Sequence, residues 1–205
     1  MASSNSTIFS NVDETSCAAS AGPAMKETEI AEHIQLIAKC IKSYPDFPKQ
    51  GVLFRDVFSI LREPKVFPVL RDVLVALTKK LNPIPECIAA LDARGFLFGP
   101  LIALELKVPF IPIRKKGKLP GEVISQTYTL EYGTDCLEIQ KESITKGVNV
   151  LVVDDLLATG GSMKAAIDLL EKAGAEVIGC LIIVEIMELN GRGKLTKPVI
   201  PIVQY

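Results

Sequence analysis

Hydrophobic residues recur every three or four positions near the beginning of the chain, which is the spacing of one helix face. The range Glu27–Ile41 shows this pattern and predicts an amphipathic helix. Tyr44-Pro45 is expected to end it, because a residue before proline avoids the helical conformation. A second run, Pro64–Leu81, begins with a proline, which the first turn of a helix tolerates. We expect that helix to end before Asn82-Pro83.

Farther along the chain, short apolar runs alternate with runs at helical spacing. Such alternation is typical of β-α-β units, in which parallel strands form a sheet and helices cover both of its faces. Val148–Val153 is interpreted as the central strand. Gly174 stands where a helix that begins near Gly161 needs a left-handed residue after its end. The successive runs are 88–91, 99–106, 108–113, 148–153, 162–173 and 177–184.

Two segments lie outside this alternation. Residues 127–140, TYTLEYGTDCLEIQ, alternate apolar and polar side chains and predict a hairpin that turns near Gly133. Residues 1–25 carry too few apolar side chains to bury, so we expect a flexible tail there. The predicted organisation is a tail over 1–25 and one α/β domain over 26–205.

Composition and charge narrow the classes of function. The chain has 205 residues, of which 48% are hydrophobic and 23% charged, as in a globular domain. A formal net charge of -1 gives no general attraction for nucleic acid or an anionic membrane, so neither partner is expected. The 5 cysteines form no C-x-x-C pair, which favours free thiols over a zinc site. With no secretion signal or membrane-spanning stretch, we expect a cytoplasmic protein.

The most informative segment is VNVLVVDDLLATGGSMKAA, residues 148–166. It places Asp154 and Asp155 at the carboxyl end of a buried strand, the edge where open α/β sheets bind ligands. The following range, Ala158–Ser162, supplies small side chains, hydroxyls and backbone amides at a helix start, which suits a phosphate. Ionised aspartates only accept hydrogen bonds, so they suit hydroxyl groups. The pattern favours a ribose 5-phosphate.

These residues also permit other interpretations. Asp154 and Asp155 could cap a helix while the glycines make a turn. Neither nucleotide-binding fingerprint competes, because the sequence contains no complete P-loop and no G-x-G-x-x-G after a strand. The only histidine, His33, lies on the first predicted helix, and no G-x-S-x-G turn is present, which argues against a serine hydrolase.

The acidic segment resembles the phosphoribosyl-pyrophosphate motif of the type I phosphoribosyltransferases. Four further stretches resemble the adenine phosphoribosyltransferases in particular, and the likeness extends over residues 26–205. It implies an open, mainly parallel sheet flanked by helices, with a small N-terminal base-binding region and a mobile hairpin loop. The implied reaction joins adenine to 5-phosphoribosyl-1-pyrophosphate (PRPP), giving AMP and pyrophosphate. The four stretches are FPKQGVLFRD, LDARGFLFGP, IRKKGKLPGE and SQTYTLEYG.

The resemblance implies roles for the residues that match each motif. Asp154 and Asp155 would hold the ribose hydroxyls. The turn after strand 88–91, where the family often has a cis peptide, would bind pyrophosphate through Asp92, Ala93 and Arg94, joined by Lys115 and Lys118 from a basic cluster. The cluster comprises Arg114, Lys115, Lys116 and Lys118, and the neighbouring glycines and proline predict a loop there. Without the resemblance, Arg94 and that cluster would be interpreted as solvated surface charges. The residues implied for the 5-phosphate are Ala158, Thr159, Gly160, Gly161 and Ser162.

The base and the chemical step are assigned in the same way. The ring of Phe54 would stack on adenine opposite Leu156, while backbone groups of Leu53 and Arg55 read the edge of the base. Plain core packing is the alternative for Phe54. The implied catalytic residues are Glu131, Tyr132 and Arg94, with Glu131 handling the proton on adenine N7; an exposed strand glutamate is the alternative there.

Further implications concern the metal and the assembly. Mg²⁺ is expected to arrive with PRPP rather than through side-chain ligands, and the family implies a homodimer. The sequence departs from the family pattern at Ala93, where serine is usual, at Leu53, where valine is usual, and at Ser162, where threonine is usual. The first removes a hydroxyl near pyrophosphate, and the second narrows the base pocket.

Three alternative functions stay open at this point. One is a related enzyme that uses xanthine or hypoxanthine. Another is a non-catalytic regulator that senses PRPP and binds nucleic acid, although the sequence lacks an added basic segment. The last is a structural protein whose acidic segment is incidental.

Overall fold

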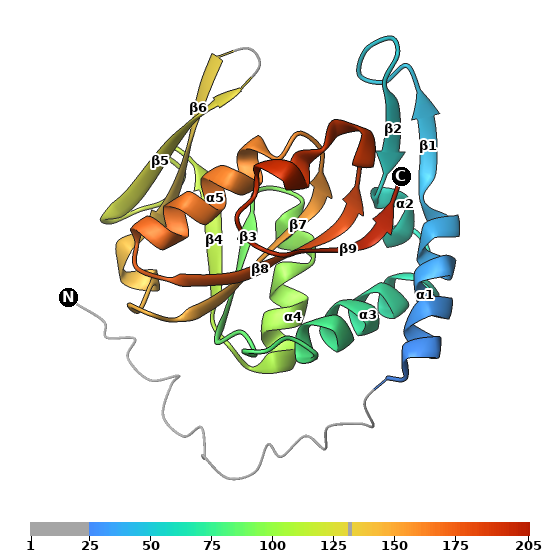
Figure 1. Ribbon diagram of the computed structural model, residues 1–205, viewed down its shortest axis with the longest axis horizontal. Coiled ribbons are helices and arrows are strands. Elements are labelled where there is room, and N and C mark those ends of the chain that lie inside the picture. The colour runs from blue at the N-terminus through green and yellow to red at the C-terminus, as the bar shows by residue number, and fades with distance from the viewer. Residues whose placement is uncertain (1–24, 131–132) are drawn as a thin grey trace, which may run out of the picture.

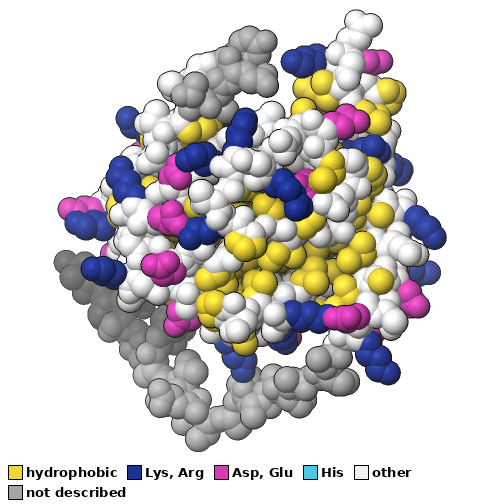
Figure 2. All heavy atoms as spheres, in the orientation of Figure 1, with side chains coloured by type: hydrophobic (Ala, Val, Ile, Leu, Met, Phe, Trp, Pro, Cys, Tyr) yellow, Lys and Arg dark blue, Asp and Glu magenta, His cyan; other side chains and the backbone are white. Residues whose placement is uncertain are grey.

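The computed structural model of the chain describes residues 25–130 and 133–205 (Figure 1). The expected tail lies outside the described residues except for Met25, which packs against a hydrophobic cluster of the domain. No helix in the described part of the chain is long and apolar enough to cross a membrane. Basic and acidic side chains are interspersed on the face shown in Figure 2.

A 7-stranded sheet with the order β5-β6-β4-β3-β7-β8-β9 forms the centre of the domain. Neighbouring strands from β4 to β9 are parallel, whereas β6 pairs antiparallel with β4 and β5. The predicted central strand, β7, lies between β3 and β8 in the parallel part, so the expected fold class is confirmed. The strands are β3 (Cys87–Leu91), β4 (Phe110–Lys115), β5 (Val123–Leu130), β6 (Gly133–Gln140), β7 (Asn149–Leu157), β8 (Glu176–Glu185) and β9 (Val199–Gln204).

Helices cover both faces of this sheet. The first face carries α1 (Glu27–Cys40), α3 (Phe67–Lys79) and α4 (Gly99–Leu106), whose buried residues join Leu151 and Val153 of β7 in one cluster. The second face carries α5 (Gly161–Lys172), which packs with Val150 and Val152. Because residues 150–153 of β7 are buried on both faces of the sheet, they form a continuous apolar run rather than an alternation. Gly174, with φ +95°, ends the α5 segment as predicted.

The N-terminal region contains elements that the sequence pattern did not predict. The strands β1 (Lys42–Pro45) and β2 (Leu53–Asp56) form a separate antiparallel sheet, so Tyr44-Pro45 belongs to a strand and not to a helix end. A short helix, α2 (Phe58–Leu61), follows. α3 begins at Phe67, whereas the sequence pattern placed its start at Pro64, which lies in the preceding turn.

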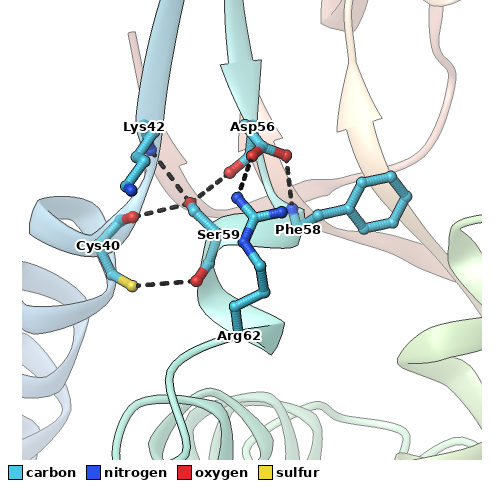
Figure 3. A network of polar contacts seen from close by, with 6 residues as sticks. All are labelled: Cys40, Lys42, Asp56, Phe58, Ser59 and Arg62. Atoms are coloured by element: carbon cyan, nitrogen blue, oxygen red, sulfur yellow. Dashed lines mark hydrogen bonds and ion pairs between the residues drawn. The ribbon is translucent and has the colours of Figure 1, made fainter.

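A polar network fixes the base of the β1-β2 hairpin (Figure 3). The buried Asp56 carboxylate accepts the Phe58 N–H at 3.0 Å and a guanidinium N–H of Arg62 at 2.7 Å. The Ser59 hydroxyl lies 2.7 Å from the carbonyl oxygen of Cys40, the last residue of α1. Because these contacts join α1, β2 and α2, they hold the segment just before Asp56 in a defined place.

The β5-β6 hairpin confirms the one predicted around Gly133. It packs beside α5, where the Lys172 ammonium donates a hydrogen bond to the Ser125 carbonyl oxygen at 2.8 Å. Figure 1 shows the β1-β2 and β5-β6 hairpins projecting from opposite sides of the same end of the molecule. The acidic pair, the turn at Arg94 and the loop before α5 lie at the carboxyl ends of β3 and β7, whereas Leu53, Phe54 and Arg55 lie on β2.

Candidate active site

Two aspartates near the end of β7 form the centre of the candidate site. Asp155 is 3% exposed, and its Oδ2 lies 2.9 Å from Nε of Arg94. The Asp154 carboxylate accepts the Asp155 N–H at 2.9 Å. Burial, followed by the charge of Asp155, raises the pKa of Asp154 well above its usual value. Burial also raises the pKa of Asp155, and the guanidinium of Arg94 opposes that rise.

The turn after β3 brings Arg94 to this pair. The peptide between Asp92 and Ala93 is cis, as the resemblance implied. A Cβ atom at Gly95 would lie 2.8 Å from the Val153 carbonyl oxygen, so only glycine lets the turn approach β7 so closely. Asp92 pairs with Arg114 of β4 at 3.2 Å. The turn is therefore tied to both neighbouring strands.

The loop between β7 and α5 leaves its amides available. α5 begins at Gly161, and no hydrogen bond in the described part of the chain uses an amide N–H of residues 158–162 as donor. Gly160 has φ +79°, and a Cβ there would collide with the carbonyl oxygen of Gly191. A Cβ at Gly191 would in turn collide with the Ala158 carbonyl oxygen. The two glycines thus let the segment 191–194 support a loop whose free N–H groups can bind an anion.

The basic cluster is divided between a strand and a turn, which corrects the expectation of a loop. Arg114 and Lys115 end β4, and only Lys116 and Lys118 lie in the turn. The Lys115 ammonium pairs with Asp135 of β6 at 3.0 Å, and this hydrogen bond is the main reason that its pKa is raised. The Tyr128 hydroxyl lies 3.4 Å from Asp135 and also hydrogen-bonds with Ser162, so the cluster is connected to the loop before α5.

A cavity of about 330 Å³ is lined in part by Leu156 and Ala158, which follow the acidic pair in the sequence. It contains all the residues that the sequence assigned to adenine, namely Leu53, Phe54, Arg55 and Leu156. Phe54 meets Phe47 edge to face with ring centroids 5.0 Å apart, and it belongs to neither buried cluster, which argues against plain core packing. Because Leu156 follows Asp155 directly, the cavity and the acidic pair adjoin.

Sequence reasoning missed several residues of this site. The cavity is also lined by Ile186, Glu188, Leu189 and Tyr205, which follow β8 or β9, and Gly191 supports the loop before α5. Their positions depend on the fold of distant segments, and no local motif marks them. Glu131 and Tyr132 lie outside the described residues.

Known proteins resemble the chain over most of its length. The family model of the phosphoribosyl transferase domain matches residues 57–199. The adenine phosphoribosyltransferase of Drosophila pseudoobscura pseudoobscura is 46% identical over 181 residues, covering 88% of this chain and 100% of that protein. The adenine phosphoribosyltransferase of Rattus norvegicus is 48% identical over 183 residues, covering 88% of this chain and 99% of that protein.

Solved structures share the fold. The adenine phosphoribosyltransferase of Saccharomyces cerevisiae, complexed with an imino-altritol bisphosphate and adenine, superposes with a TM-score of 0.79 at 42% identity, covering 84% of this chain and 99% of that one. The Trypanosoma brucei enzyme, in complex with AMP, pyrophosphate and ribose-5-phosphate, gives a TM-score of 0.76 at 32% identity, covering 84% of this chain and 79% of that one.

Proposed function

The chain belongs to the phosphoribosyltransferase family, among its adenine phosphoribosyltransferases, and on this premise we propose how its residues convert adenine and PRPP to AMP and pyrophosphate. It is a pentosyl-transferring enzyme of purine salvage. One observation supports the proposal most strongly. The cavity lined by residues 53–55 is also lined by Leu156, which directly follows Asp155, so a base and a ribose can lie next to each other.

We assign the sugar phosphate to β7 and the loop that follows it. The carboxylates of Asp154 and Asp155 accept hydrogen bonds from the ribose hydroxyls. The free amides of residues 158–162, at the N-terminus of α5, bind the 5-phosphate together with the hydroxyls of Thr159 and Ser162. The two groups are adjacent in one polypeptide segment, as the two ends of a ribose 5-phosphate require.

Pyrophosphate lies on the other side of the acidic pair. Arg94 reaches Asp155 from the turn of Asp92 and Ala93, so its guanidinium can bind phosphate oxygens next to the ribose. Lys115 and Lys118 provide further positive charge on the β4 side. These cations stabilise the negative charge that accumulates on the leaving group.

Adenine occupies the cavity between Phe54 and Leu156. Along a strand the backbone polar groups alternate in direction, so Leu53 and Arg55 present theirs toward the same edge of β2. β2 pairs only with β1 in the described part of the chain, which leaves its other edge open for the base. Leu53 narrows the pocket relative to the valine that is usual in the family.

The reaction is a displacement with inversion at the anomeric carbon. The bond from adenine N9 to this carbon forms as the bond to pyrophosphate breaks, through a transition state with oxocarbenium character. We assign Glu131 to the proton on adenine N7, with Tyr132 beside it. Glu131→Ala is expected to lower turnover by about 10²-fold, the scale of one positioned acid or base. Turnover equal to that of the unchanged enzyme would remove Glu131 from the mechanism.

Magnesium is proposed to enter as part of the substrate. Mg²⁺ prefers phosphate oxygens and water to a dedicated protein cage, and it neutralises pyrophosphate charge when bound. The described residues contain no group of three or more His, Cys, Asp or Glu side chains arranged for a metal.

A panel of bases tests the substrate assignment. The purified protein is incubated with labelled PRPP, Mg²⁺ and adenine, hypoxanthine, guanine or xanthine, and the labelled nucleotides are separated. Adenine alone is expected to give product at an appreciable rate. Preferential use of a 6-oxopurine would assign the chain to another purine substrate, and no product from any base would contradict the proposed enzyme.

Two expectations from the sequence stay predictions. A homodimer is proposed on the basis of the family, and light scattering of the purified protein would measure its mass. The cytoplasmic location would be checked by fractionating cells that express the full chain.

A further inference from the structure

Tyr205, at the end of β9, forms part of the wall of the adenine cavity. The guanidinium carbon of Arg55 lies 3.7 Å from the centroid of its ring, which is the geometry of a cation–π stack. Both residues line the cavity. The stack therefore joins β2, which carries the base-binding backbone, to the far end of the main sheet.

The tyrosine itself is held at several points. Its N–H donates to the Glu185 carbonyl oxygen at 3.0 Å, and its own carbonyl oxygen accepts the Met187 N–H at 2.8 Å. Its hydroxyl lies 3.4 Å from the Ala38 carbonyl oxygen on α1. The ring also packs against the cluster on the first face of the sheet. Tyr205 is thus a fixed platform, because β8, α1 and the core all restrict it.

Arg55 is held on a second side. Its Nη1 donates a hydrogen bond to the Ser43 hydroxyl at 2.6 Å, across the β1-β2 pair. No ion pair links Arg55 to a carboxylate within residues 25–130 and 133–205. A planar guanidinium stacks well on an aromatic face. The ring therefore takes the place of a carboxylate partner and adds no charge of its own to the pocket.

We propose that Tyr205 is a positioning residue for the base. By holding the Arg55 side chain against the wall, it keeps the guanidinium out of the space for adenine and fixes the backbone at Leu53 and Arg55. This inference rests on the proposed use of the cavity for adenine. Tyr205 then determines adenine affinity, while the PRPP subsites, built on β3, β7 and α5, are independent of it.

Steady-state kinetics with both substrates varied separate this role from a general structural one. Tyr205→Leu is expected to raise the KM for adenine about tenfold, with kcat and the KM for PRPP within about twofold of the unchanged enzyme. Tyr205→Phe keeps the aromatic ring, so its KM for adenine is expected to equal that of the unchanged enzyme. Phe67→Leu is the matched control, because it removes a ring that packs against the same cluster but does not line the cavity.

Arg55→Gln provides an independent variant at a half-buried strand position. It is expected to raise the adenine KM by a similar factor, and adding Tyr205→Leu should raise it little further, because one stack is lost in either case. An unchanged adenine KM in Arg55→Gln, or fully multiplicative effects in the double variant, would overturn the inference even if Tyr205→Leu fails to fold. Absence of AMP formation by the unchanged protein would instead contradict the proposed function.

Discussion

Nε of Arg94, in the turn after β3, lies 2.9 Å from Oδ2 of Asp155 in β7. The pair joins the turn after β3 to the acidic end of β7. Under the proposed function, it places a cation for pyrophosphate beside a hydrogen-bond acceptor for the ribose hydroxyls. The Arg94 guanidinium also offsets the negative charge of the buried Asp155 carboxylate.

Replacing Arg94 by glutamine tests whether the reaction needs the positive charge of the guanidinium. The variant keeps hydrogen-bonding groups but loses the charge and fork that bind phosphate oxygens, so we expect turnover to fall by about 10²- to 10³-fold. AMP formation at saturating substrates measures the effect. Arg71→Gln, at an exposed helix position where Arg71 pairs with Asp72, is the control. Equal rates for Arg94→Gln and the control would exclude Arg94 from the reaction.

Asp154→Asn is expected to make the free protein more stable and the enzyme slower. The folded-state pKa of Asp154 is raised above its unfolded value, so the carboxyl group lowers the stability of the fold as the pH rises past the unfolded value, and asparagine removes this cost. The increase in the free energy of unfolding should be complete above the raised pKa. It should shrink as the pH falls toward about 3.9, the ordinary pKa of an aspartate. Denaturant unfolding at several pH values measures it. A less stable variant at pH 7 would contradict the account.

Gly191→Ala is expected to weaken PRPP binding by about tenfold or more. The added methyl group would collide with the Ala158 carbonyl oxygen, so the loop that binds the 5-phosphate must shift. Gly193→Ala is the matched control, because its methyl group would meet only the side chain of Asn190, at 3.0 Å. Calorimetric titration with PRPP compares the two variants. Equal affinity in both would mean that the segment at Gly191 does not support the loop.

Glu185 is expected to stabilise the segment 191–194 in a pH-dependent way. It is 1% exposed, and the Arg192 guanidinium binds both of its carboxylate oxygens while Gln204 donates to one at 2.9 Å. These hydrogen bonds with Arg192 are the main reason that the pKa of Glu185 is lowered from 4.5. Because the folded pKa is the lower one, the stabilisation is present above the unfolded value and is lost as the pH falls through the folded value.

Glu185→Gln should therefore lower the free energy of unfolding by about 2 kcal/mol at pH 7, and the difference should narrow below pH 4.5. Glu122→Gln provides the comparison, since the side chains of Glu122 and Lys141 are 80% and 64% exposed and such pairs contribute little. A difference from the unchanged protein that is independent of pH would show that the charge of Glu185 is not the cause.

Much of the fold could be predicted from local sequence. The buried runs 87–91 in β3 and 150–153 in β7 are continuously apolar, and α5 lies between Gly161 and the left-handed Gly174. The acidic pair could also be predicted, because one segment contains the strand, the carboxylates and the phosphate loop. The strand β1 could not be predicted, because all four of its residues are exposed and lack the alternation of a half-buried strand.

The walls of the site depend on contacts between distant segments. Tyr205 reaches the adenine cavity because β9 is parallel to β8 at the sheet edge, and Gly191 reaches Ala158 because the chain turns back after β8. Neither residue lies in a recognisable motif. The basic cluster was assigned to a loop because its charges and glycines suit one, but pairing with β6 extends β4 through Arg114 and Lys115.

The central claim is that this chain makes a glycosidic bond between adenine and the ribose of PRPP. The most direct measurement incubates the purified protein with adenine, PRPP and Mg²⁺ and quantifies AMP and pyrophosphate by chromatography, with the Asp154→Ala, Asp155→Ala double variant in parallel. The account predicts AMP and pyrophosphate in equal amounts from the unchanged protein and nearly none from the double variant. Unconsumed adenine with the unchanged protein, or equal AMP from both proteins, would contradict it.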